Sequence, residues 1–62
     1  MDETLKRKMI EARDRHREFA ALMAQRAGRP ENAPWEKDLL AIGREEENLA
    51  EELDKSIQKL GG

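Results

Sequence analysis

The chain has 62 residues, of which 42% are charged and 3% aromatic, and its formal net charge is −2. A chain of this length holds one domain at most, and the absence of Cys excludes a disulfide framework and a thiolate metal site. Residues that favour strands are nearly absent while Ala, Leu, Glu, Lys and Arg dominate, so the composition predicts an all-α protein.

The first predicted helix covers residues 2–27, approximately. Asp2 and Glu3 suit the positive end of its dipole. Its main apolar stripe advances in alternating steps of four and three residues, which is the spacing of a coiled-coil seam. The stripe consists of Leu5, Met9, Ala12, His16, Phe19 and Met23.

A loop is predicted over residues 28–33. Gly28 suits the position just past a helix, where φ is often positive, and Pro30 cannot continue that helix. Asn32 can cap a following helix, and Pro34 fits a first turn because its missing N–H has no intrahelical partner there.

The second predicted helix covers residues 33–60, approximately, and Gly61 ends it. Glu36 and Asp38 lie near its positive end, and Lys55 and Lys59 lie near its negative end. Its main stripe has the same alternating spacing. That stripe consists of Trp35, Leu39, Ile42, Glu46, Leu49, Leu53, Ser56 and Leu60.

A short connection between two long helices predicts an antiparallel helical hairpin that forms a single domain over residues 1–62. The two main stripes are expected to face each other. With the turn centred near residue 31, Phe19 meets Ile42 and Gly43, while His16 meets Glu46. A glycine inside a helix costs about 1 kcal/mol relative to alanine, so close packing is the expected reason for Gly43.

A second apolar stripe lies beside each main stripe and is wider than one hairpin seam requires. It predicts a homodimer that forms a four-helix bundle, with the second stripes and Trp35 at the interface. Trp35 is interpreted either as a cap over the bundle end or as an exposed anchor for another protein. The predicted interaction residues are Ile10, Ala20, Ala24, Trp35, Leu40, Gly43, Ala50 and Ile57.

His16 and Glu46 are polar residues in otherwise apolar stripes, and the antiparallel register places them at one height. Such a pair sets register and orientation in helical bundles. The alternative interpretation is a metal-binding bundle, because a dimer supplies two His16 and two Glu46. No other catalytic, phosphate-binding or metal-binding pattern is found, and no cofactor is expected.

The charges are uneven, with a balance of +2 over residues 2–27 and −4 over residues 34–60. Basic residues near the start alternate with acidic ones, and the second helix would repel nucleic acid. Neither an apolar stretch long enough for a membrane span nor a signal peptide is present, so we expect a cytoplasmic protein that binds no membrane.

One segment, Ala50-Glu51-Glu52-Leu53-Asp54-Lys55-Ser56-Ile57, resembles the Ser-x-x-Leu-Asp signature of small helical-hairpin phosphatases that act on sporulation response regulators. The resemblance implies that Leu53 and Asp54 meet a phosphorylated receiver domain, with Ile57 as packing support. Ala50 stands where that family has Ser, and this hairpin is longer.

The sequence therefore predicts a self-associating helical hairpin that acts as an interaction or scaffold module and not as an enzyme. Its expected partner is itself or a helical segment of another protein. The alternatives are the metal-binding bundle and the receiver-domain phosphatase. A designed origin is also considered, because Val, Tyr and Cys are all missing.

Overall fold

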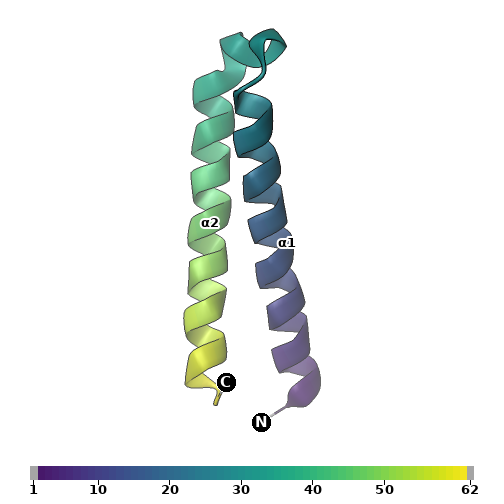
Figure 1. Cartoon of the computed structure of the whole chain (residues 1–62). Coiled ribbons are helices and arrows are strands. Elements are labelled where there is room, and N and C mark those ends of the chain that lie inside the picture. The colour runs from purple at the N-terminus through teal and green to yellow at the C-terminus, as the bar shows by residue number, and fades with distance from the viewer. Residues whose placement is uncertain (1, 62) are drawn as a thin grey trace.

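The chain folds as two long antiparallel helices joined by a short connection. The structure is a computed structural model that describes residues 2–61. Helix α1 spans Glu3–Ala27, the 3-10 helix η1 spans Pro30–Trp35 and helix α2 spans Glu36–Lys59. The helices lie side by side with both ends of the chain at the end opposite the connection (Figure 1). The predicted all-α helical hairpin is thus confirmed.

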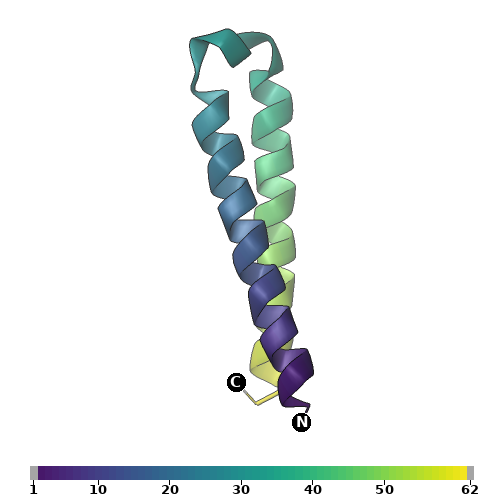
Figure 2. The ribbon, with the colours of Figure 1, turned by 90° about the vertical axis from the view of Figure 1, so that its right-hand side faces the viewer.

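The hairpin is long and thin, with Cα extents of 47 × 14 × 11 Å. In the second view α1 crosses obliquely over α2 (Figure 2). Neither helix within residues 2–61 carries an apolar run long enough to cross a membrane.

The start of α1 is capped by a side chain. Oδ1 of Asp2 accepts hydrogen bonds from the backbone N–H groups of Thr4 at 2.9 Å and Leu5 at 3.3 Å. These donors have no partner inside the helix, so the carboxylate satisfies them and complements the positive end of the dipole.

The connection differs from the predicted loop in three respects. Gly28 has φ −79°, so it is right-handed and not at a positive φ. The Asn32 side chain does not cap α2; its Nδ2 donates to the backbone oxygen of Arg26 at 3.0 Å and so closes the end of α1. Finally, α2 begins at Glu36 and not at residue 33, because η1 occupies the intervening residues.

The two prolines explain this 3-10 helix. Pro30 lies at the first position, where a missing N–H costs nothing, but Pro34 lies inside the segment, so an α-helix here would lose the hydrogen bond of residue 34 and crowd the carbonyl of residue 30. The tighter turn uses the donors that remain, such as the Glu36 N–H bonded to the Ala33 oxygen. At the far end, Gly61 adopts φ +88°, which stops α2 as predicted.

Small residues occupy the seam between the helices. Ala20 and Ala27 of α1 recur seven residues apart, as do Gly43, Ala50 and Ile57 of α2, and all five are buried. A Cβ at Gly43 would lie 3.4 Å from Met23 Cβ and 3.5 Å from the Ala20 oxygen. The predicted close packing at Gly43 is therefore confirmed, although its neighbours are Ala20 and Met23 and not Phe19.

The predicted seam is half wrong. Each predicted stripe contains two alternating sets of positions. One set borders the observed seam and includes Met9, Met23, Leu39 and Leu53, which are partly buried. The other set, one residue before each seam position, is exposed, except for Ala12, which is partly buried. Small residues take the seam because they let the two backbones approach closely, and bulky side chains move to one side. The displaced set consists of Leu5, Ala12, Phe19, Trp35, Ile42 and Leu49.

Candidate interaction face

The displaced side chains lie along one side of the hairpin. Leu5, Phe19, Trp35, Ile42 and Leu49 are each at least 40% exposed although all are large and apolar. Each of these residues immediately precedes a seam position of its helix. Because the two helices run antiparallel, the residues that precede the seam positions point to the same side of the hairpin in both helices. We call this side the apolar face. It comprises the displaced set, together with Met9, Met23, Leu39 and Leu53 at its centre.

The opposite side of the hairpin is a shallow groove of about 380 Å³, here called the alanine groove. It contains much less large apolar surface, since Leu40 is its one large apolar side chain. Both helices contribute to it: Ala21 and Arg44, which follow the seam residues Ala20 and Gly43 by one position, both line the groove. It is lined by Ala20, Ala21, Ala24, Leu40, Gly43, Arg44 and Glu47.

The predicted interaction residues are divided between these surfaces. Ala20, Gly43, Ala50 and Ile57 are buried in the seam of their own hairpin, so they offer little surface to a second copy, although Ala20 and Gly43 also line the alanine groove. Ile10 is partly buried, and Ala24 and Leu40 are exposed on the side of the alanine groove. Trp35 is 56% exposed and lies at the end of the apolar face next to the connection. Four of the eight predicted interaction residues therefore lie in the seam, and half of the main stripe is left exposed.

A polar layer interrupts the apolar face near mid-length. Nδ1 of His16 lies 2.5 Å from Oε1 of Glu46, so the ring N–H donates to the carboxylate across the two helices. The side chains remain 33% and 22% exposed, respectively. The predicted meeting of these two residues is confirmed, and so is the register on which it was based.

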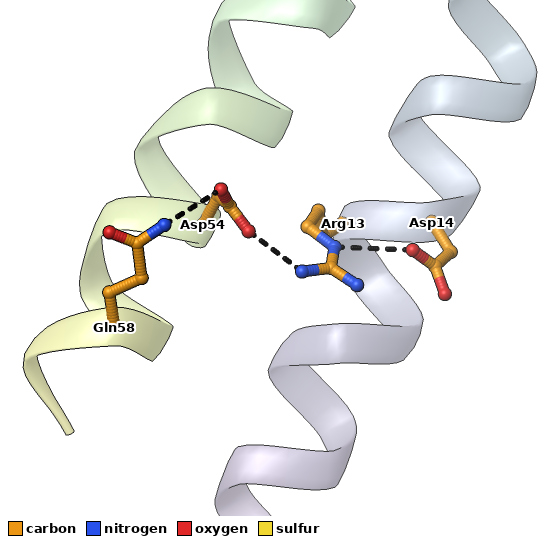
Figure 3. A network of polar contacts seen from close by, with 4 residues as sticks. All are labelled: Arg13, Asp14, Asp54 and Gln58. Carbon is orange, nitrogen blue, oxygen red and sulfur yellow. Dashed lines mark hydrogen bonds and ion pairs between the residues drawn. The ribbon is translucent and has the colours of Figure 1, made fainter. Parts of the chain in front are cut away.

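A second polar contact joins the helices nearer the open end. Nη1 of Arg13 donates to Oδ1 of Asp54 at 2.7 Å, and its Nε donates to Asp14 at 3.2 Å (Figure 3). Gln58 donates to the other Asp54 oxygen at 3.3 Å. The hydrogen bonds to Asp54 and then Asp14 raise the pKa of the Arg13 guanidinium above its ordinary value. Arg13 therefore remains charged and links two carboxylates, Asp54 on the other helix and Asp14 on its own.

This network bears on the segment that resembles the phosphatase signature. Asp54 is only partly exposed, and both of its oxygens accept hydrogen bonds from side chains of this chain. A receiver domain would have to displace Arg13 and Gln58 to reach this carboxylate. The Arg13–Asp54 pair could not be predicted from the apolar spacing, because neither residue belongs to an apolar stripe.

The chemistry available to one hairpin is limited. Within residues 2–61, no three His, Asp or Glu side chains are grouped so that they could hold a metal ion. A metal site at His16 and Glu46 would therefore need the same two residues from a second copy.

Comparisons with protein-family models, with curated proteins and with solved structures find no match to this chain.

Proposed function

We propose that the protein is a non-enzymatic interaction module that self-associates through its apolar face. The observation that carries this proposal is the gathering of large exposed apolar side chains on one side of a hairpin. Scattered apolar residues are normal on a protein surface, but a contiguous patch of them marks an interaction site.

The small core of the hairpin supports the same proposal. Its buried apolar residues are three alanines and Ile57, and no large side chain within residues 2–61 is fully buried. Because alanine contributes little apolar area, one hairpin gains less from burial than a domain of this length needs. Packing a partner on the apolar face would supply the missing burial, as in a four-helix bundle.

Two leucines of α2 provide a matched test. Leu49 lies on the apolar face and is 47% exposed, whereas Leu40 lies on the alanine groove and is 44% exposed. Leu49→Lys should raise the dimer dissociation constant at least thirtyfold, because a lysine would be buried among apolar groups. Leu40→Lys should leave it within about threefold.

Sedimentation equilibrium of the wild type and both variants measures these constants. Melting of the wild type should also rise with protein concentration, because association stabilises only the folded form. A wild type that is monomeric at tens of micromolar contradicts the proposal. So does dissociation by Leu40→Lys together with no effect of Leu49→Lys, since that result would assign the interface to the alanine groove.

A further inference from the structure

The borders of the apolar face carry opposite charges. On α1 the outer border contains Lys8, Arg15 and the uncharged Leu22, and on α2 it contains Asp38, Glu45 and Glu52, followed by one basic residue, Lys59, in the last turn, so its net charge is negative. Arg15 and the three acidic residues make no ion pair inside the hairpin among residues 2–61. The α1 border is thus positive and the α2 border negative, and most of these charges have no opposite charge bound to them.

The face is also large enough for a stable dimer. The hairpin is 47 Å long, and two helices of about 10 Å each give a projected area on the order of 900 Å² per copy. A stable interface buries about 800 Å² per partner. A second hairpin, which has the same length and presents the same apolar groups, can cover the face from end to end.

Two arrangements of a second copy place apolar face against apolar face. With the two-fold axis along the hairpin, α1 of each copy lies on α2 of the other and both connections are at one end. With the two-fold axis across the hairpin, α1 lies on α1 and the connections are at opposite ends. Since His16 and Glu46 lie near the middle of their helices, both arrangements superpose the polar layers.

We propose that the occupant of the apolar face is a second copy related by a two-fold axis along the hairpin. This inference rests on the proposed self-association and specifies its geometry. The charged borders favour it, because the positive α1 border then lies along the negative α2 border of the other copy. In the alternative arrangement, like charges meet on both sides.

The polar layer favours the same arrangement. Each His16 already donates from Nδ1 to its own Glu46, which leaves Nε2 and the second carboxylate oxygen available. With α1 on α2, His16 lies against Glu46 of the second copy, and in its imidazolium form, which donates from both ring nitrogens, the four side chains alternate around a closed ring. With α1 on α1, His16 would meet His16 and Glu46 would meet Glu46, so two carboxylates would be buried together.

Distances between spin labels test the orientation directly, because the chain has no Cys and a single introduced Cys is labelled uniquely. Glu31→Cys labels the connection and Thr4→Cys labels the open end. In the proposed dimer, the distance between each label and the same label on the second copy should be at most about 30 Å. The four-helix bundle is only two helices wide, and each helix is about 10 Å in diameter. Separations that approach the 47 Å length of the hairpin would overturn the proposed axis.

A third label separates the orientation from association itself. Asn48→Cys lies near mid-length, so both arrangements give it a short distance. A short distance at Asn48 with long distances at Glu31 and Thr4 refutes only the orientation. Absence of any dipolar coupling at Asn48, with monomeric mass in sedimentation, refutes self-association and with it this inference.

Charge exchange provides an independent test. Arg15 and Glu45 directly precede His16 and Glu46, so they border the same layer and should meet across the proposed dimer. Arg15→Glu and Glu45→Arg should each raise the dissociation constant about tenfold at low salt, because two attractive pairs become repulsive. The double variant should return to within about twofold of the wild type.

Arg7→Glu, on the other side of α1, is the matched control and should change the constant little. The single-variant effects should fade at about 1 M salt, as expected for exposed charges. Single variants that bind as tightly as the wild type, or a double variant as weak as the singles, would contradict the proposed pairing of α1 with α2.

Discussion

The seam and the apolar face use the same two helices but very different side chains. The seam consists of alanines, one glycine and Ile57, and all are buried. The apolar face carries the larger groups, among them Phe19 and Trp35, which are 43% and 56% exposed. Close approach of the two backbones therefore selects small residues for the seam, even though larger apolar residues are available one position away.

The largest expected effect comes from filling the seam. Ala50 is 0% exposed, so Ala50→Leu should destabilise the hairpin by about 2–3 kcal/mol through overpacking. Ala41→Leu, on the exposed surface of the same helix, should change stability by less than about 0.5 kcal/mol. Urea denaturation measures both. Equal tolerance of leucine at the two positions would mean that the seam is not closely packed.

The polar layer tests the central part of the apolar face. His16→Leu alone should cost about 1–2 kcal/mol, because it leaves the Glu46 carboxylate without its donor in a partly buried site. Combining it with Glu46→Leu should recover most of that loss, since both polar groups are then removed. The measurement is a double-mutant cycle by urea denaturation. Additive effects would mean that the two residues do not interact in solution.

Gly43 measures how tight the seam is. Alanine should relieve the cost of a glycine inside a helix, about 1 kcal/mol. A Cβ there would reach ordinary van der Waals contact with Met23 at 3.4 Å. We therefore expect Gly43→Ala to raise stability by about 0.5 kcal/mol, and Gly43→Leu to lower it. The melting temperature of each variant, compared with that of the wild type, gives the sign of its effect on stability. A large loss of stability with alanine would show that the helices approach more closely than in the structure.

The Arg13–Asp54 pair should have the smallest effect on stability. Its charges are accessible to solvent, so Arg13→Gln should lower the melting temperature slightly, and by less at about 1 M salt. Asp54→Asn should behave in the same way, and the double variant should lose no more than either single variant. A loss that is independent of salt would indicate that the hydrogen bond, and not the charge, stabilises this end of the hairpin.

Some features of the site could be predicted because they depend on spacing along the chain. His16 and Glu46 each interrupt a stripe, and their equal distance from the turn is enough to bring them together. The occupation of the seam by small residues of the second stripe, in place of half of the main stripe, could not be predicted in this way. Both stripes repeat every seven residues, so periodicity alone does not say which of them faces the other helix.

Local sequence signals were enough to predict the two helices, their antiparallel course and the height of each residue along the hairpin. Helix-forming residues, the two prolines and Gly61 act locally, so their effects can be recognised without the rest of the molecule. Only the tertiary structure decided how far each helix is rotated about its own axis. That rotation depends on the distance between the backbones, which Gly43, Ala20 and Ala50 make short by packing against each other's helices. This rotation leaves Phe19, Ile42 and Leu49 exposed, on the side where we propose that a second copy binds.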